Sequence, residues 1–201
     1  MKPILFNAEM VRAILDGRKS VTRRDPFQTQ PDYDVLKGLY RDGKGRLCAL
    51  FQCRKDPTTE AVYARYDRGD ILWVRETWAA WSPTYGVAPK LYYKADGDAP
   101  AGIKWRPSIH MPKEAARLFL RVTGVRVERL RDIECIATEG IMMVPADNKR
   151  DPRYYFAKLW DTTIKPADLP LYGWEDNPWV WVIKFERISK DEALGGGGDA
   201  N

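Results

Sequence analysis

Apolar and polar residues alternate along much of the chain, and this two-residue period is typical of β-strands. Residues 116–130 alternate over the longest stretch, which predicts either one bent strand or a hairpin. Gly124 is the expected bend, because a glycine inside a strand often marks one. Shorter alternating stretches predict strands at 3–6, 47–53, 61–66, 71–78 and 178–188, and allow one more at 90–95.

The helical period of 3.6 residues occurs in three short stretches. Residues 7–17 run from a capping Asn7 to a terminating Gly17, and two more helices are predicted at 131–141 and 151–160. These helices fall between strands without the regular alternation that a doubly wound sheet requires. We therefore expect an α+β fold, a small mixed β-barrel with short flanking helices.

The chain is expected to form a single domain over residues 1–190. Two polar, turn-rich stretches interrupt the pattern and predict insertions at about 25–68 and 79–104. Within the first insertion, residues 25–46 are expected to form an ordered loop. The glycine-rich end of the chain predicts a flexible tail over 191–201.

The composition limits the class of protein. The chain has 201 residues, of which 44% are hydrophobic, and eight tryptophans supply ample material for a core. The net charge of +5 allows a nucleic-acid or phosphate-bearing partner without requiring one. No apolar run approaches the roughly 20 residues that span a bilayer, so no membrane partner is expected.

Cysteine and histidine usage adds two expectations. Three cysteines form no CxxC pair and the N-terminus is not signal-like, which predicts free thiols and a cytoplasmic location. His110 is the one histidine and has no neighbouring cysteine, so we expect neither a zinc site nor another metal or cofactor.

Residues 17–24, GRKSVTRR, concentrate four cations just after the first predicted helix. If 20–24 is extended, Thr22 and Arg24 face one way and Arg23 the other, with Val21. Arg23 and Arg24 are equally compatible with phosphate contact and with solvation. Lys19 can be a functional amine, or it can simply neutralise the C-terminus of the helix.

Two later segments also combine aromatic and polar residues. In GDILWVRETW, Arg75 can bind a phosphate or pair with a carboxylate, and Glu76 can accept a hydrogen bond from the exocyclic amine of a base. Trp78 can stack on a base or form a hydrophobic lid. The segment WRPSIHMP is stiffened by two prolines and presents further substrate-binding candidates, which are Trp105, Arg106, Ser108 and His110. His110 can carry a proton or be structural.

Taken together, GRKSVTRR, GDILWVRETW, IATEGI and WVWVIKFERI resemble, in order and spacing, the ASCH family of PUA-like proteins. The longer ASCH proteins of phages and prophages look most similar, since they share WVRETW and WRPSIHMP almost as written here. The resemblance covers residues 3–188 apart from the insertions. It implies a PUA-like barrel with a cleft for a modified nucleoside or a stretch of RNA or DNA.

The resemblance also implies a set of catalytic residues. The small N4-acetylcytidine amidohydrolases of this family use a lysine, a threonine and a glutamate, which correspond to Lys19, Thr22 and Glu139. The sequence departs from them at Ser20 and in being about twice as long. The resemblance implies a metal-independent hydrolysis. In it the threonine attacks an N-acyl carbonyl, the lysine acts as base, and the glutamate orients the lysine or acts as acid.

Two other functions remain open from the residues. The same arginines can grip RNA or DNA in a binding module without turnover. They can also stabilise phosphoryl charge in a metal-independent ribonuclease.

Overall fold

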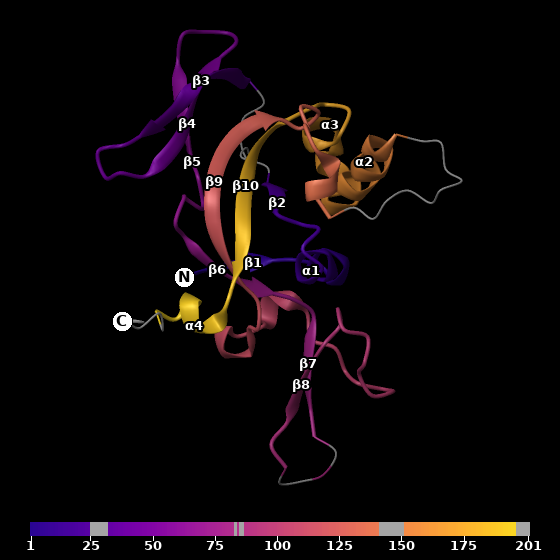
Figure 1. The fold of residues 1–201 in the computed structure, drawn as a ribbon. Coiled ribbons are helices and arrows are strands. Elements are labelled where there is room, and N and C mark those ends of the chain that lie inside the picture. The colour runs from indigo at the N-terminus through magenta and orange to yellow at the C-terminus, as the bar shows by residue number, and fades with distance from the viewer. Residues whose placement is uncertain (25–31, 83, 85–86, 141–150, 196–201) are drawn as a thin grey trace.

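The computed structural model describes residues 1–24, 32–82, 84, 87–140 and 151–195, and the protein belongs to the α+β class, as predicted. Its main sheet has five strands in the order β1-β6-β9-β10-β2 (Figure 1). Strand β1 runs parallel to β6, and the other neighbours are antiparallel. The bounds are β1 (Lys2–Leu5), β6 (Ile71–Arg75), β9 (Phe119–Arg129), β10 (Trp179–Ile188) and β2 (Val21–Arg24).

The two long strands β9 and β10 form the middle of this sheet. Apolar side chains of β10 are buried at Val180, Val182 and Phe185, as a strand packed on its neighbours requires. The pairing of β9 with β10 shifts between Lys184 and Phe185, opposite Gly124. The predicted stretch is therefore one strand with a bulge at Gly124, and the alternative of a hairpin is wrong.

Two helices lie beside the edge strand β2 (Figure 1). Helix α1 (Ala8–Leu15) begins where the Asn7 side chain accepts a hydrogen bond from the backbone of Met10, at 2.8 Å. Helix α2 (Pro152–Thr163) is capped in the same way by Asp151. The apolar face of α2 packs against Val21 of β2 and the buried valines of β10. Both helices were predicted, and their apolar faces form walls beside β2.

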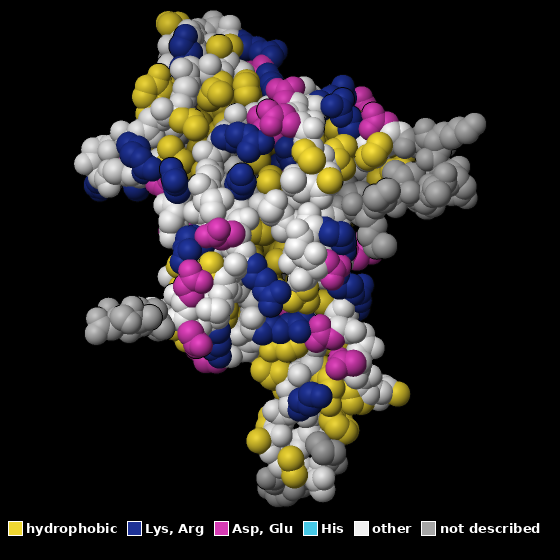
Figure 2. All heavy atoms as spheres, in the orientation of Figure 1, with side chains coloured by type: hydrophobic (Ala, Val, Ile, Leu, Met, Phe, Trp, Pro, Cys, Tyr) yellow, Lys and Arg dark blue, Asp and Glu magenta, His cyan; other side chains and the backbone are white. Residues whose placement is uncertain are grey.

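Two smaller sheets extend from the main one. A three-stranded sheet consists of β3 (Tyr33–Arg41), β4 (Leu47–Cys53) and β5 (Thr59–Tyr63), and a hairpin consists of β7 (Trp78–Trp81) and β8 (Lys90–Tyr93). Phe51 attaches the three-stranded sheet to Trp181 of β10. Apolar side chains gather on the surface of both extensions (Figure 2).

Several sequence predictions need correction. Residues 33–41 form β3, not a loop. The alternation of apolar and polar residues is weak here, because the pairing shifts next to Gly38 and the strand is charged and lies at an edge. The stretch 71–78 is two strands, because the chain leaves the main sheet after Arg75. The expected helix at 131–141 is only the 3₁₀ turn η3 (Ile136–Thr138), preceded by an extended Cys135.

The remaining elements are short. The predicted tail begins instead with helix α4 (Lys190–Ala193), which is capped by Ser189, and residues 196–201 lie outside the described part of the chain. The other short helices are η1 (Ser108–His110), η2 (Lys113–Ala115), η4 (Pro166–Asp168) and α3 (Leu169–Tyr172). Within the described ranges, no helix combines the length and apolarity needed to cross a membrane.

The main sheet does not close into a barrel through its backbone. Its order ends at β1 on one side and β2 on the other, and among the described residues these two edges share no ladder of backbone hydrogen bonds. A side chain joins them instead, since Arg24 Nη2 donates to the carbonyl of Leu5 at 2.9 Å. The edges are therefore close in space at the end of β2.

Candidate functional site

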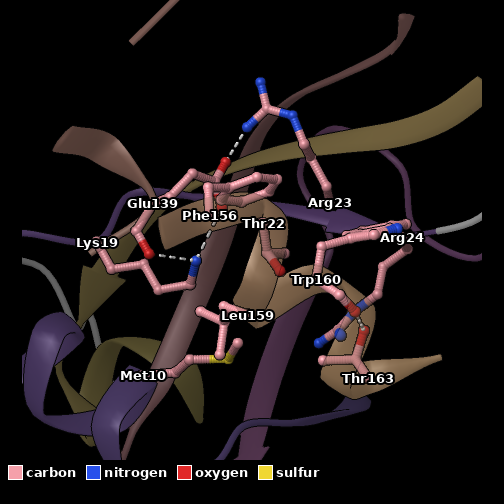
Figure 3. Close-up of a pocket in the computed structure, with 10 residues that line it drawn as sticks. All are labelled: Met10, Lys19, Thr22, Arg23, Arg24, Glu139, Phe156, Leu159, Trp160 and Thr163. Atoms are coloured by element: carbon pink, nitrogen blue, oxygen red, sulfur yellow. Dashed lines mark hydrogen bonds and ion pairs between the residues drawn. The ribbon is translucent and has the colours of Figure 1, made fainter. Parts of the chain in front are cut away.

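A pocket lies beside the edge strand β2, between α1, α2 and the turn after η3 (Figure 3). Its cavity volume is about 50 Å³, well below the roughly 300–1,000 Å³ typical of small-molecule sites, and the pocket is open to solvent. Its lining residues are Met10, Lys19, Thr22, Arg23, Arg24, Glu139, Phe156, Leu159, Trp160 and Thr163.

The pocket gathers most of the buried polar groups of the protein. The described residues include five buried polar or charged side chains, and four of them line this pocket. Burying such groups is costly unless they are paired, so their concentration in one place makes this pocket the candidate site. These four residues are Lys19, Thr22, Arg23 and Glu139.

Backbone contacts bring position 139 to position 19, although 120 residues separate them. Lys19 and Glu139 form an isolated antiparallel bridge, and the Ser20 amide donates to the carbonyl of Thr138 at 3.0 Å. The turn after η3 therefore lies alongside the segment that leads into β2. This is the placement on which the predicted lysine, threonine and glutamate set depended.

A glycine makes this close approach possible. Gly140 has a φ of +74°, which disfavours any residue with a side chain. A Cβ built at this position would lie 2.5 Å from the Cβ of Ala13 and 2.9 Å from that of Lys19. Both neighbouring atoms sit at the base of their side chains and cannot swing away. Gly140 therefore allows the turn that carries Glu139 to pack against α1.

Lys19 is buried and held by one residue. Its Nζ donates to the backbone carbonyl of Glu139 at 2.9 Å and to the carboxylate Oε2 of Glu139 at 3.1 Å. A neutral amine has two N–H bonds and one lone pair. If both N–H bonds are directed to Glu139, the lone pair is directed away from it, which is the orientation that a general base needs.

The electrostatic surroundings lower the pKa of Lys19. Burial is the largest cause, the contact with Glu139 opposes it, and the neighbouring Arg24 and Arg23 add to the lowering. The neighbouring cations therefore contribute less to this lowering than burial does. Arg18 does not take part, since it donates to the carboxylate of Asp16 and to a backbone carbonyl.

Arg23 is occupied by two carboxylates. Its Nη1 donates to Oε1 of Glu139, and its Nε donates to Oε1 of Glu128 at 3.1 Å. The side chain is 3% exposed, so the solvated alternative is wrong for Arg23. It shares a face of β2 with Val21, as predicted, because its guanidinium lies 5.9 Å from the ring of Phe156. Arg23 therefore holds Glu139 in place.

Glu139 in turn has both carboxylate oxygens in use. Oε1 accepts from Arg23 and Oε2 accepts from Lys19 (Figure 3). Neither oxygen is left to carry a proton to a leaving group. Of the two roles open to Glu139, these contacts favour orientation of the lysine over acid catalysis.

Thr22 and Arg24 face the space that the ion pairs leave open. In Figure 3 the Thr22 hydroxyl lies between the Lys19 amine and the Arg24 guanidinium. Arg24 is half-buried, and its Cζ lies 5.4 Å from the centre of the Phe6 ring. Burial lowers the pKa of Arg24 from its usual range. Among the described residues, no carboxylate lies within ion-pair distance of it.

The candidates from GDILWVRETW lie elsewhere. Both carboxylate oxygens of Glu76 accept from Arg117, at 2.9 and 3.1 Å, so they are not free to accept from a base. Trp78 is 5% exposed, belongs to a hydrophobic cluster and does not line the pocket at β2. Arg75 donates to the carbonyl of Ile109 and not to a carboxylate.

The segment WRPSIHMP packs against the residues of GDILWVRETW. Arg106 pairs with Trp78 through two backbone hydrogen bonds, and its guanidinium lies 5.1 Å from the Trp78 ring. Ser108 is half-buried and His110 is exposed, and both belong to η1, while Trp105 is half-buried beside Arg106. None of these residues lines the pocket at β2. The structure thus separates the sequence candidates into two groups.

Other residues of the pocket were not singled out from the sequence. Phe156 and Trp160 come from the apolar face of α2, a helix that the sequence predicts without indicating a site on it. Met10 comes from α1 in the same way. Glu128 supports the pocket from β9 through its contact with Arg23. The helical period identifies such faces, but only the packing shows that they border a pocket.

The described cysteines are free thiols, and Cys48 and Cys53 are buried while Cys135 is exposed. Within the described ranges, no three His, Cys, Asp or Glu side chains gather as a set of metal ligands. Comparison of the chain with models of protein families, with curated proteins and with solved structures finds no match. The pocket itself is therefore the basis for a functional proposal.

Proposed function

We propose that this protein is an ASCH-family hydrolase with a PUA-like fold, and that it removes an N-acyl group from a nucleobase. The leading substrate is an N4-acylated cytidine. One observation supports this most directly: Lys19, Thr22 and Glu139 line the same pocket although they come from distant parts of the chain. The main sheet is open in its backbone pairing, and the contact of Arg24 with Leu5 across its two edges supports a barrel-like arrangement of the PUA-like kind.

The first chemical step uses the hydroxyl of Thr22. The Lys19 amine accepts the hydroxyl proton while Thr22 Oγ1 bonds to the acyl carbon, which gives a tetrahedral intermediate. The C–N bond to the base then breaks, and the Lys19 ammonium returns its proton to the leaving nitrogen. The products of this step are the free nucleobase amine and an acyl ester on Thr22.

The second step restores the enzyme. Lys19 accepts a proton from water, the resulting hydroxide attacks the ester carbonyl, and the C–O bond to Thr22 breaks. The proton on Lys19 passes to the Thr22 oxygen, and the acyl group leaves as a carboxylic acid. Burial favours this cycle because it lowers the pKa of Lys19, so that a larger fraction of the amine is neutral.

The pocket walls suit a planar base. Phe156 and Trp160 of α2 are stacked on each other with an interplanar angle of 24°, and both border the pocket. Aromatic and aliphatic surfaces of this kind bind the face of a nucleobase, while the polar residues opposite act on its substituents.

Turnover of N4-acetylcytidine, followed by chromatography, tests the proposal. The wild type should release cytidine and acetate, and Thr22→Ala should reduce the rate at least about 100-fold, since the nucleophile is lost. Thr163→Ala is the matched control, because it removes a second threonine hydroxyl that lines the pocket but donates to the Trp160 carbonyl at 2.7 Å. Full activity of Thr22→Ala would contradict the mechanism.

The same experiment with labelled RNA addresses the two other functions. Shortened RNA would support a ribonuclease, and intact RNA that is retarded on a native gel would support a binding module. Either result, without release of cytidine from the acylated nucleoside, would replace the proposal.

A further inference from the structure

The charged side chains at the pocket differ in how they are paired among the residues that the structure describes. Lys19 and Arg23 both contact Glu139, and Arg23 also contacts Glu128. Glu128 also pairs with Arg126, whose Nε lies 2.8 Å from Glu128 Oε2. Three cations therefore share the two carboxylates. Arg24 lines the same pocket, and no carboxylate among the described residues pairs with it.

The contacts of Arg24 fix the guanidinium but leave most of its donors unused. A guanidinium has five N–H donors. In the described part of the chain, Arg24 uses one nitrogen, Nη2, to donate to the Leu5 carbonyl, and its guanidinium rests near the ring of Phe6. Figure 3 shows the group on the side of Thr22 that is opposite Lys19, next to Thr163. The guanidinium is thus held in one position beside the proposed nucleophile.

A half-buried cation without a counter-charge is unfavourable. Burial disfavours the charged form and is the main reason why the pKa of Arg24 is lowered; Tyr66 and Glu139 offset this only in part, and among the described residues no carboxylate forms an ion pair with Arg24. An oxyanion bound in the pocket supplies the missing charge. The planar fork of a guanidinium fits the two oxygens of a carboxylate or phosphate especially well.

We propose that the substrate of this pocket carries its own oxyanion, a phosphate or a carboxylate, and that Arg24 binds it. This inference rests on the proposed hydrolase function and specifies its substrate. A phosphate would belong to a nucleotide, and a carboxylate would belong to the acyl group that is removed. Arg23 has no such role, because its donors are already directed to Glu139 and Glu128.

Binding measurements by calorimetry test this with the full-length Thr22→Ala protein, which is not expected to turn over its ligands. Three ligands differ in the anionic group that they carry: N4-acetylcytidine has none, its 5′-monophosphate carries a phosphate, and N4-succinylcytidine carries a carboxylate on the acyl group. At least one charged ligand should bind about 10-fold more tightly than N4-acetylcytidine, as a charge-assisted hydrogen bond predicts. The tighter of the two shows whether the anion is a phosphate or a carboxylate.

Arg24→Gln in the same background should remove that advantage and change the affinity for N4-acetylcytidine less than about twofold. Glutamine can still donate to the Leu5 carbonyl, and Arg24→Lys tests charge without the planar fork. Arg12→Gln is the matched control, because Arg12 also donates to backbone carbonyls, at 2.6 and 3.2 Å, but does not line the pocket. A melting curve of each variant checks its fold.

Two results would overturn the inference: charged ligands that bind no better than N4-acetylcytidine, or an Arg24→Gln variant that loses affinity for all three ligands equally. The second result would instead indicate that Arg24 supports the base or the fold. Turnover by the wild type is read separately. Arg24-dependent binding without hydrolysis would reject the hydrolase function and support the anion site. Hydrolysis of N4-acetylcytidine by the wild type, with equal binding of all three ligands, would support the hydrolase function and reject the anion site.

Discussion

Gly140→Ala is the substitution that most directly tests how the site is assembled. Its effect can be worked from two features of the structure. The φ of +74° costs a residue with a side chain about 1–2 kcal/mol. The added methyl also overlaps the Cβ of Ala13, at 2.5 Å, and overpacking of this kind costs about 1–3 kcal/mol. We expect a loss of about 2–5 kcal/mol in the free energy of unfolding.

Gly17→Ala separates the two contributions. Gly17 has almost the same φ, +72°, but a Cβ at this position would meet nothing within 4 Å. It should therefore lose only the backbone contribution, about 1–2 kcal/mol. Urea unfolding of both variants measures the difference, which isolates the close approach of the turn to α1.

A second variant tests the contact itself. Ala13→Gly removes the nearest atom, so Gly140→Ala should cost less in the Ala13→Gly background than in the wild type, although the Cβ of Lys19 still lies 2.9 Å away. Gly140→Ala should also lower turnover, because the turn carries Glu139. Equal destabilisation of Gly140→Ala and Gly17→Ala, together with additive effects in the double variant, would refute this account of the turn.

Two further predictions follow from buried polar groups. Among the described residues the indole N–H of Trp78 has no acceptor, whereas that of Trp160 donates to a backbone carbonyl at 2.7 Å; Trp160→Phe should therefore destabilise the protein by about 0.5–1.5 kcal/mol more than Trp78→Phe in urea unfolding, and equal losses would argue against this. The lowered pKa of Lys19 means that the folded protein binds fewer protons than the unfolded chain between that lowered pKa and the ordinary value of 10.5. The stability of the wild type relative to Lys19→Met should thus rise with pH across this window, measured by urea unfolding at a series of pH values, and a difference that does not change with pH would show that the Lys19 pKa is not lowered.

The sequence predicts the elements around the pocket better than the contacts within it. The alternation in β9 and β10 and the capped helices α1 and α2 follow from local patterns, because each pattern is set by burial of one face. The turn that carries Glu139 does not, since it depends on a glycine fitted against another part of the chain. The family resemblance brings position 139 together with 19 and 22, whereas no spacing in the sequence does.

The contrast between Arg23 and Arg24 shows why local patterns stop short of function. Strand alternation correctly sends the two side chains to different surroundings. It cannot show that Glu128 and Glu139 form ion pairs with Arg23, whereas no described carboxylate forms one with Arg24. The two arginines therefore differ in their ion pairs, because the partners of Arg23 come from β9 and from the turn after η3.

The cost of the buried network is itself an argument for function. Ion pairs removed from water are often no more stabilising than apolar residues of the same size, and can be less so. A protein that needed only to cover the edge of β2 could do so with aliphatic side chains, as α2 already does at Val21. Here the edge instead carries Lys19, Arg23 and Glu139, with a threonine between the two cations in sequence. Stability alone does not account for that choice, whereas the role proposed for Lys19, an amine kept partly neutral and held in one orientation, does.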